Sequence, residues 1–363
     1  MRKILYIVHR MEYSGAPISL LRVLRHLDRS RFEPTILATR PGPMLKEYRD
    51  QGINCRVWPE RENFFSKSDI LRLIYLIVKN RIDIVHVNTG VLPAAVLAAG
   101  LSPAKCVWHI REFPSAPPNR NWRLARRFAD FFIFNSHHTH LSLSRMVRID
   151  QKWRVIYSGV DLPFDSLPPP ETGSRFKIAT VGNIQSTKGQ IYLVDALARL
   201  RPRYPGIEFH LVGDFFQKDY VEEIQNRARE KNVLDRFIFH GRQADPMRIV
   251  RDCDLLVHPA IVEPLGNVII EAMAWGKPVV AFDAGGPAEI IKDGETGYLV
   301  PRHDSGLLAD RISDLLQDPG LRHRMGQNAF REIQKRFAAD VIAKEMMDIY
   351  NSLLVGTIKE EKE

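Results

Sequence analysis

The sequence predicts an α/β protein built from two doubly wound, Rossmann-like domains that face each other across a cleft. Short apolar segments alternate with amphipathic ones along the whole chain, and this alternation restarts after a proline-rich stretch at 162–170. The 363 residues, 45% of them hydrophobic, suffice for about two domains with their own cores. Strands that alternate with helices form parallel sheets covered on both faces, and such sheets bind ligands at the carboxyl ends of their strands.

Each predicted strand is a run of about five apolar residues followed by a polar turn. In the first half we expect strands at 4–8, 35–38, 84–87, 105–109 and 131–135, and in the second half at 177–181, 208–212, 237–239, 255–258, 278–282 and 297–300. Apolar residues at helical spacing predict helices at 18–27, 70–79 and along the tail at 322–354. The predicted domains are therefore 1–165 and 171–340, with a C-terminal helix at 341–363 that we expect to pack back on the first domain.

Cysteine usage and the amino terminus indicate where the protein works. Cys55, Cys106 and Cys253 are odd in number and far apart, which argues against a disulfide framework or a zinc site and for a reducing compartment. The first apolar run is short and ends at His9 and Arg10, so it reads as a strand and not as a secretory signal. We expect a cytoplasmic protein, soluble or held at the inner face of the cytoplasmic membrane.

The positive charge is concentrated in the first half of the chain. Residues 1–170 carry 26 Lys and Arg against 14 Asp and Glu, whereas residues 171–363 carry 26 against 29. This asymmetry indicates an anionic partner such as a phospholipid surface, a lipid-linked phosphate or nucleic acid, although solubility alone could also explain it. Because no nucleic-acid module accompanies the charge, nucleic-acid binding is not expected.

One basic segment of the first half, 117–128, combines four arginines with Trp122, Leu124 and Phe128. An interfacial helix requires an apolar face with a basic rim, and this segment has both. The alternative is a helix that packs by its apolar side and leaves its arginines in solvent.

Two carboxylates, Glu263 and Glu271, frame a predicted helix start in the second half. Gly266 and Asn267 would supply a turn and an N-cap, an apolar helix would follow, and Gly276 would end it. The first amides of that helix would be free for a diphosphate, and ionised carboxylates accept hydrogen bonds from sugar hydroxyls. The alternative is a loop charge and a solvated helix residue.

Three further turns of the second half follow strands and should reach the same sheet edge. The turn at 180–189 places Gly182, Asn183 and Lys188 where a phosphate could lie, although it does not match the P-loop pattern. The segment 239–243, with Arg242, could hold a nucleobase, and the glycine-containing turn at 284–289 follows another strand.

In the first half, Gly15 and His109 lie at the carboxyl ends of predicted strands. Gly15 permits close approach of a phosphate or sugar to the backbone, and His109 could bond a substrate hydroxyl or stabilise developing charge. Glu112 could fix the tautomer of His109 or orient an acceptor. The neighbouring histidines His137, His138 and His140 do not share one helix face, so no metal site is expected there.

The segment 258–301 resembles the carboxyl-terminal signature of the family 4 glycosyltransferases, which are retaining enzymes of the GT-B fold. The resemblance rests on the Glu263 and Glu271 pair with Pro-Leu-Gly between, the run Glu-Ala-Met-Ala-Trp-Gly-Lys-Pro-Val-Val, and the motifs at 285–289 and 293–300. Weaker matches occur at 157–161, at Gly182 with 188–189, and at Gly15, so the resemblance extends over nearly the whole chain.

The resemblance implies that the second domain binds a nucleotide-sugar donor and the first binds the acceptor. Glu271 would hold the ribose, Glu263 the donor sugar and Lys188 the phosphates, with His109 close to the sugar. Three backbone amides would contact the sugar or the diphosphate: those of Leu265, Gly266 and Asn267. Such enzymes need no metal or other cofactor. Asn183 and Gly15-Ala16 depart from the residues frequent in the family, an arginine and two glycines respectively.

We therefore expect a retaining glycosyltransferase that moves a hexose or related sugar from a nucleoside diphosphate to a lipid-linked or polysaccharide-precursor acceptor. Its product would serve cell-envelope or exopolysaccharide biosynthesis. Two alternatives remain open: a sugar-nucleotide epimerase of the same fold, and a sugar-nucleotide-binding protein without catalytic activity.

Overall fold

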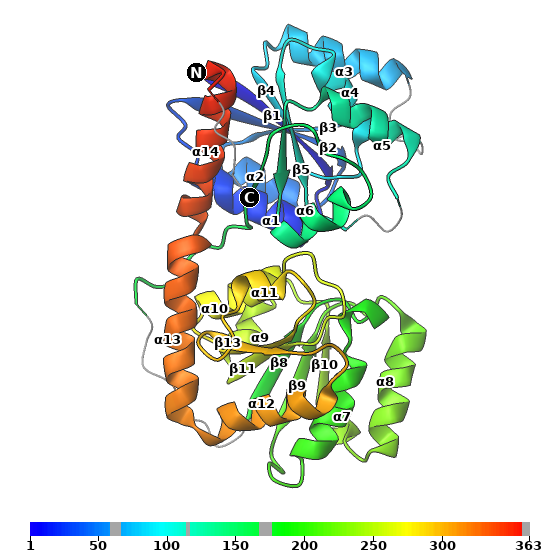
Figure 1. Cartoon of the computed structure of the whole chain (residues 1–363), viewed down its shortest axis with the longest axis vertical. Coiled ribbons are helices and arrows are strands. Elements are labelled where there is room, and N and C mark those ends of the chain that lie inside the picture. The colour runs from blue at the N-terminus through cyan, green and yellow to red at the C-terminus, as the bar shows by residue number, and fades with distance from the viewer. Residues whose placement is uncertain (59–66, 114–116, 167–175, 358–363) are drawn as a thin grey trace. The chain divides into compact units, whose positions relative to one another are not determined.

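A computed structural model describes residues 1–58, 67–113, 117–166 and 176–357 of the chain (Figure 1). Parts of the predicted proline-rich linker and of the C-terminal tail, 167–170 and 358–363, lie outside these described residues. The chain forms two compact units, one comprising Met1–Gly159 with Ala338–Glu363 and the other Val160–Phe337. We predicted domain limits at 165 and 171 and a returning helix from 341.

The first unit contains a seven-stranded, fully parallel sheet in the order β3-β2-β1-β4-β5-β6-β7. Its strands are β1 (Arg2–Arg10), β2 (Phe32–Arg40), β3 (Asn54–Val57), β4 (Ile84–Val87), β5 (Lys105–Ile110), β6 (Phe131–Phe134) and β7 (Trp153–Val155). All five strands predicted for this half are confirmed. The two that the pattern missed, β3 and β7, are the edges of the sheet, where a strand is short and needs no continuous apolar run.

Helices cover both faces of this sheet. One core contains alternate strand residues such as Tyr6 and Ile133 with side chains of α1 (Gly15–Arg25), α2 (Met44–Asp50) and α14 (Ala339–Val355). The other contains the intervening strand residues with α3 (Lys67–Lys79), α4 (Pro93–Gly100), α5 (Arg120–Ala125) and α6 (His137–Ser144). Because side chains alternate along a strand, these nearly continuous apolar strands supply both cores.

The second unit contains a six-stranded parallel sheet in the order β10-β9-β8-β11-β12-β13. Its strands are β8 (Lys177–Val181), β9 (Glu208–Val212), β10 (Phe237–Gly241), β11 (Leu255–His258), β12 (Val279–Phe282) and β13 (Gly297–Val300). All six were predicted. The sheet packs against a core built largely from α7 (Ile191–Leu200), α8 (Lys218–Glu230) and α12 (Ser305–Gln317), whereas α10 (Asn267–Ala274) contacts α9 (Met247–Arg251), α11 (Pro287–Ile290) and α13 (Pro319–Arg336). The described residues also contain the 3-10 turns η1 (Arg126–Phe128), η2 (Ser186–Lys188) and η3 (Leu234–Arg236).

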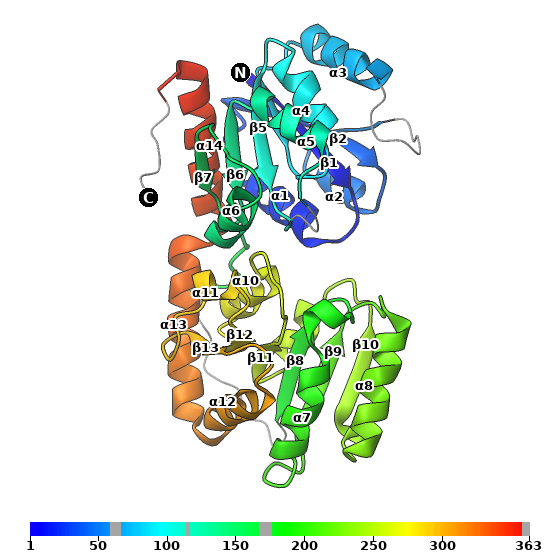
Figure 2. The same cartoon turned by 45° about the vertical axis from the view of Figure 1, so that its right-hand side comes forward.

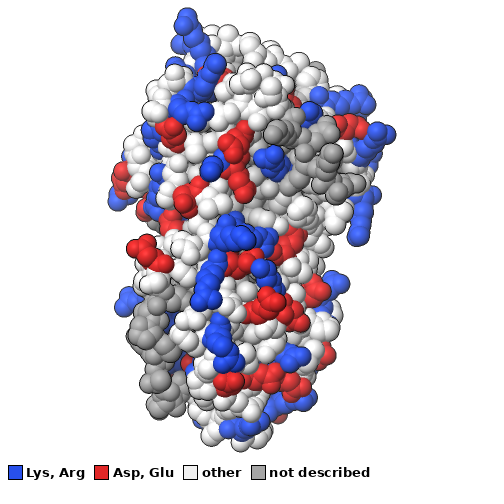
Figure 3. All heavy atoms as spheres, turned by 60° about the vertical axis from the view of Figure 1, so that its left-hand side comes forward, with Lys and Arg blue, Asp and Glu red and all other residues white. Residues whose placement is uncertain are grey.

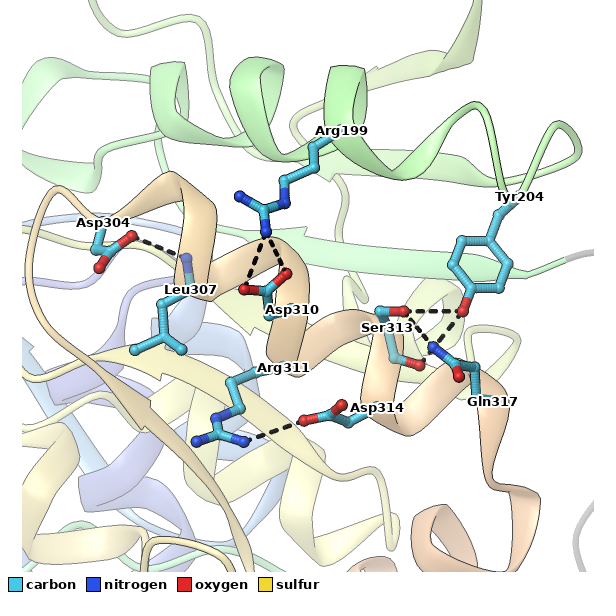
Figure 4. A network of polar contacts seen from close by, with 9 residues as sticks. All are labelled: Arg199, Tyr204, Asp304, Leu307, Asp310, Arg311, Ser313, Asp314 and Gln317. Carbon is cyan, nitrogen blue, oxygen red and sulfur yellow. Dashed lines mark hydrogen bonds and ion pairs between the residues drawn. The ribbon is translucent and has the colours of Figure 1, made fainter.

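Polar contacts at the surface join α12 to α7 and to the turn that follows α7 (Figure 4). Arg199 donates to Asp310 at 2.8 Å, and the hydroxyl of Tyr204 lies 2.9 Å from that of Ser313. Asp304 caps α12 by accepting the backbone N–H of Leu307 at 2.8 Å. Because these charges are largely exposed, the buried apolar face of α12 supplies most of its stability and the polar contacts fix its direction.

The predicted helical tail is two helices, α13 in the second unit and α14 in the first. They are separated at Phe337 and Ala338, where the backbone leaves helical geometry. In Figures 1 and 2, α14 lies along the first sheet, and Ile342, Met346 and Ile349 of this helix are buried in its core. The helix therefore contributes to a core whose other buried residues, Ile4 to Ile156, come from the first half of the chain.

The arginine-rich segment 117–128 does not form an interfacial helix with an aromatic anchor. Trp122 is buried, and its ring lies 4.6 Å from that of Trp108, centroid to centroid. Leu124 is exposed, but the segment packs inward through Trp122 and Ala125. The alternative prediction, an inward apolar side with arginines outside, describes it better. Within the described residues, no helix has both the length and the apolar character to cross a bilayer.

Candidate active site

The turn after β8 is locked to the loop after β9 at the carboxyl edge of the second sheet. Ile184 N–H donates to the carbonyl of Asp214 at 2.8 Å, and Ser186 N–H donates to Gln217 Oε1 at 2.8 Å. A Cβ added at Gly213 would lie 2.0 Å from the carbonyl oxygen of Gly182, so only glycine permits this approach. Two loops from neighbouring strands thus form one rigid surface.

The same turn is locked on its other side to the loop after β11. Ile261 N–H donates to the carbonyl of Thr187 at 3.0 Å. Gly189 has a left-handed φ of 66°, and a Cβ there would lie 2.0 Å from the carbonyl oxygen of Pro259. This close approach fixes the backbone directly after Lys188 and thereby limits where the lysine side chain can reach.

The β11 loop in turn joins the loop after β12. Glu263 and Gly285 form an isolated parallel bridge, and Gly286 N–H donates to the carbonyl of Glu263 at 3.0 Å. The loops after β8, β9, β11 and β12 consequently meet at one edge, which is where parallel sheets present their ligands.

Helix α10 begins at this edge, one residue earlier than predicted. Gly266 is the N-cap, with a left-handed φ of 103°, and Asn267 is the first helical residue, so the prediction of Asn267 as cap was wrong. Only glycine adopts this φ without strain, which explains the shift. The amides at the start of α10 have no preceding helical carbonyl and can receive an anion. Leu265, just before the cap, is buried.

The far end of α10 closes as the sequence predicted, with Gly276 in left-handed geometry after the C-cap Trp275. Gly276 N–H donates to the carbonyl of Met273 and Lys277 N–H to that of Ala272, the two bonds of a Schellman motif. Glu271 lies in the second turn of this helix and is partly buried.

Lys188, Glu263 and His258 form the charged centre of the second unit. Lys188 Nζ lies 2.6 Å from Glu263 Oε2, and His258 Nε2 lies 3.0 Å from the same oxygen. Burial raises the pKa of Glu263, but the charge of Lys188 and the bond and charge of His258 outweigh it and lower this pKa to about 2. Because the carboxylate can only accept, His258 Nε2 must carry the proton.

His258 was missed by the sequence analysis, although its position offered a signal. It is the last residue of the buried strand β11 and it is buried itself. A histidine at the carboxyl end of a parallel strand is placed to serve a site at that edge.

The remaining predicted donor-binding residues of this unit lie on the same set of loops. Asn183 is exposed, and its backbone carbonyl accepts from Gln190 Nε2 at 3.0 Å. Gly182 precedes it with a φ of 146°. Arg242 is exposed and directly follows Gly241, the last residue of β10, which has a left-handed φ of 64°.

In the first unit, Gly15 follows the turn after β1 and is the first residue of α1. It is exposed. His109 lies near the carboxyl end of β5 and is fully buried. Both therefore occupy the edge of the sheet to which the sequence assigned them.

His109 is bonded to a neighbour that the sequence analysis did not anticipate. Its Nδ1 lies 3.2 Å from His86 Nε2, and His86 Nδ1 lies 2.7 Å from the hydroxyl of Tyr350, which donates to Tyr6 at 3.1 Å. Glu112 instead accepts from Thr89 Oγ1 at 2.8 Å and from Gly90 N–H at 3.0 Å, so it does not fix the tautomer of His109 as we had considered.

The direction of the hydrogen bonds among Tyr6, Tyr350, His86 and His109 defines the tautomers of the two histidines. Because Tyr350 donates to Tyr6, its oxygen accepts from His86 Nδ1, and His86 Nε2 is left to accept from His109 Nδ1. Burial, together with the charge of Arg111, lowers the pKa of His86 to about 3 and that of His109 well below its usual range. His109 is therefore a neutral imidazole whose Nε2 is an acceptor.

Comparison with known proteins identifies the class to which this fold and these motifs belong. Residues 13–164 match the model described as Glycosyltransferase Family 4, and residues 167–332 match that of Glycosyl transferases group 1. The chain belongs to the family 4 glycosyltransferases, as its motifs indicated.

Among individual relatives, the chain is 32% identical over 179 residues to the lipopolysaccharide core biosynthesis glycosyltransferase LpsE of Rhizobium meliloti, covering 49% of each chain. It is 27% identical over 180 residues to the capsular polysaccharide biosynthesis glycosyltransferase CapM of Staphylococcus aureus, covering 50% of this chain and 47% of CapM. The match thus spans about half the length of these curated relatives.

Solved structures resemble the chain over nearly its whole length. The structure of Anabaena HepE in complex with UDP and glucose has a TM-score of 0.82 and 25% identity, covering 97% of this chain and 100% of that one. Sucrose-phosphate synthase from Thermosynechococcus elongatus shares the fold, with a TM-score of 0.77 at 20% identity, and covers 98% and 100% of the two chains. The predicted GT-B fold is confirmed.

Proposed function

We propose that this protein transfers a sugar from a nucleoside-diphosphate sugar to a lipid-linked or polysaccharide-precursor acceptor, with retention of the anomeric configuration. The observation that carries the proposal is the group Lys188, Glu263 and His258 beside the start of α10, among four interlocked loops. A fixed cation and free helix amides at one sheet edge suit a diphosphate.

The proposed reaction breaks the bond between the anomeric carbon and the diphosphate oxygen and forms one to the acceptor oxygen on the same face of the sugar. The departing phosphate oxygen takes the acceptor proton. Lys188 and the first amides of α10 stabilise the negative charge that grows on the leaving diphosphate, where electrostatic stabilisation lowers the barrier. Glu263 binds the donor sugar and Glu271 the ribose.

Pairing of Lys188 with Glu263 has a consequence for donor binding. A diphosphate must attract Lys188 away from a carboxylate at 2.6 Å, and His258 remains to hold Glu263 when the lysine moves. We therefore assign His258 the role of keeping Glu263 ionised and oriented towards the sugar. The proposed donor carries a uridine diphosphate, because the similar HepE was solved with UDP and glucose.

We propose further that the first unit binds the acceptor at an anionic membrane surface, through α3. Leu71, Tyr75 and Val78 of this helix are 68%, 62% and 51% exposed, and their spacing places them on one helix face. Arg72 and Lys79 are exposed beside them. An exposed apolar stripe with a basic rim is the pattern of a helix that lies in a lipid interface.

One face of the molecule is mixed in charge. Figure 3 shows Lys and Arg interspersed with Asp and Glu over the face it displays. The 12 excess positive charges of residues 1–170 support attraction to anionic lipid, and α3 gives that attraction an apolar contact.

The test is a donor screen with the purified protein. Nucleotide sugars that differ in base and sugar are supplied with and without lipid-linked or polysaccharide-precursor acceptors, and released nucleotide and product linkage are measured. Lys188→Ala and Glu263→Ala should each lower turnover more than about tenfold. Lys231→Ala, which removes an exposed lysine at the end of α8, serves as the matched control.

Near-normal turnover in both site variants would contradict the site. Conversion of the donor sugar to its epimer without acceptor would identify the epimerase, and donor binding by calorimetry without turnover on any acceptor would identify a binding protein.

A further inference from the structure

Arg111 is a buried cation at the carboxyl edge of the first sheet, directly after β5. It is 8% exposed, and no carboxylate lies within ion-pair distance of its guanidinium in the described parts of the chain. Buried charges in proteins are normally paired, because an isolated charge loses its hydration without compensation. The missing partner indicates a place for an anion.

Only two of the three guanidinium nitrogens of Arg111 donate hydrogen bonds to described residues. Its Nε donates to Asn88 Oδ1 at 3.0 Å and its Nη1 donates to Ser158 Oγ at 3.4 Å, both neutral acceptors. The remaining N–H groups on Nη2 have no partner among the described residues. Guanidinium groups bind carboxylates and phosphates with two parallel hydrogen bonds, and the fixed Nε and Nη1 orient the fork for such a ligand.

Other polar atoms around Arg111 are also unpaired. Asn88 Nδ2, Asn135 Oδ1 and His109 Nε2 are buried and have no hydrogen-bond partner among the residues that the structure describes. They come from the carboxyl ends of three adjacent strands, β4, β5 and β6. Asn135 is tied to the group because its Nδ2 donates to the Arg111 carbonyl at 3.0 Å. A buried polar atom without a hydrogen bond destabilises the fold, and a polar ligand would supply the missing bond.

The register of the sheet shows that these side chains share one face. His86 pairs with Val107, two residues before His109, and His109 pairs with Ile133. Residues two positions further along, Asn88, Arg111 and Asn135, therefore point to the same side as His86, His109 and Ile133.

Glu112 does not neutralise Arg111 directly. Its carboxylate accepts from Thr89, Gly90 and the backbone N–H of Arg111. Burial lowers the pKa of Arg111 to about 10, although the charge of Glu112 opposes this, so the guanidinium stays protonated at neutral pH.

We propose that Arg111, with Asn88 and His109 beside it, binds an oxyanion of the acceptor: a sugar carboxylate or a phosphate. The guanidinium supplies the fork, Asn88 Nδ2 a further donor, and His109 Nε2 an acceptor for a neighbouring hydroxyl. The identification of the anion as part of the acceptor rests on the proposed function. The binding of an anion at Arg111 does not depend on that function.

The test measures anion binding without donor or turnover. Glucuronate and glycerol phosphate are titrated into the full-length protein by calorimetry at constant ionic strength, with chloride as reference. All titrations are repeated in Lys188→Ala, which removes the cation of the second unit that could also bind phosphate. Wild type and Lys188→Ala should bind at least one probe. Tighter binding of glucuronate would identify the oxyanion as a sugar carboxylate, and tighter binding of glycerol phosphate would identify it as a phosphate.

Two variants examine the role of Arg111. Arg111→Gln should weaken binding by roughly tenfold or more, the value of a charge-assisted bond. Asn88→Asp places a carboxylate against the guanidinium and should abolish binding while retaining the bond to Nε, so it is informative even if Arg111→Gln does not fold. Arg127→Gln, which removes a basic side chain of η1, is the control for general charge.

Equal affinity in wild type and Asn88→Asp, or no binding of either probe by wild type, would overturn the proposal. If the probes bind as expected but the donor screen detects no transfer, the anion site stands and the proposed function fails.

Discussion

At the scale of the residue, Glu263 is a buried carboxylate kept ionised by two partners. Its pKa is lowered from 4.5 to about 2. A group whose pKa is lower in the folded state stabilises the protein above its unfolded pKa, and this contribution disappears as pH falls through the folded value. Folding therefore loses the contribution of Glu263 between about pH 4.5 and pH 2.

We expect Glu263→Gln to lower the free energy of unfolding at pH 6 by about 3 kcal/mol, the equivalent of this pKa shift. Below pH 4.5 the difference from wild type should shrink. Urea unfolding of both proteins at pH 6, 4.5 and 3.5 measures it. A difference that does not change with pH would mean that Glu263 acts only through packing.

At the scale of the element, the turn after β8 depends on Gly189 for two separable reasons. Its φ of 66° is left-handed, and its Cβ position is occupied by the Pro259 carbonyl oxygen. Gly52 has a φ of 69°, and no atom of the described residues lies within 4 Å of its Cβ position. A substitution at Gly52 therefore measures the cost of the left-handed φ alone.

Gly52→Ala should cost about 1–2 kcal/mol of stability from backbone strain alone. Gly189→Ala should cost more, and it should also weaken UDP binding, because Pro259 or the turn carrying Lys188 must move. Thermal unfolding and calorimetry with UDP compare the two. Equal losses in both variants, with UDP binding unchanged, would show that the contact with Pro259 does not position the turn.

The proposed membrane contact of helix α3 can be tested by removing its exposed apolar side chains. The double variant Leu71→Ser and Tyr75→Ser should weaken binding to phosphatidylglycerol vesicles by about tenfold, because the lost apolar contact is worth 1–2 kcal/mol or so. Flotation at low and high salt measures it, with Leu141→Ser, at a leucine of α6 that is 52% exposed, as control. Vesicle binding that is unaffected by either substitution would place the lipid contact elsewhere.

At the scale of the whole molecule, the end of the chain returns to the first unit, where Tyr350 completes the hydrogen-bonded series of Tyr6, His86 and His109. Tyr350 is 264 residues from His86 in the sequence and 2.7 Å from it in space. Helix α14 thus joins the end of the chain to a residue we assign to the site.

Tyr350→Phe should lower turnover roughly tenfold, because the hydroxyl that fixes the tautomers of His86 and His109 is lost. Nitrogen-15 spectra of the histidines should show the tautomers change. Tyr48→Phe is the matched control, since its hydroxyl is equally buried in the same core but donates to the carbonyl of Pro17 at 2.7 Å. Unchanged histidine spectra in Tyr350→Phe would disprove the tautomer assignment.

Much of the architecture could be predicted from the sequence because strands and helices have local signals. Eleven strands were predicted by apolar runs, and the missed β3 and β7 lack such runs because they are edges. Trp122 illustrates the limit: its spacing with arginines suggested a lipid anchor, and only packing against Trp108 shows that it points inward. Asn267 illustrates another, since the choice between cap and first helical residue depends on one φ angle.

The sequence by itself determined the two parallel α/β units, the succession of strands and turns along the chain, and the family. Periodicity and glycine-rich motifs are local properties of the chain. Only the tertiary structure decided that Lys188 pairs with Glu263, that His258 supports the pair and that Tyr350 reaches His86. It also decided that Arg111 is buried with no carboxylate partner in the described part of the chain. These contacts join residues from different strands and loops, and strand order and the return of α14 bring them together.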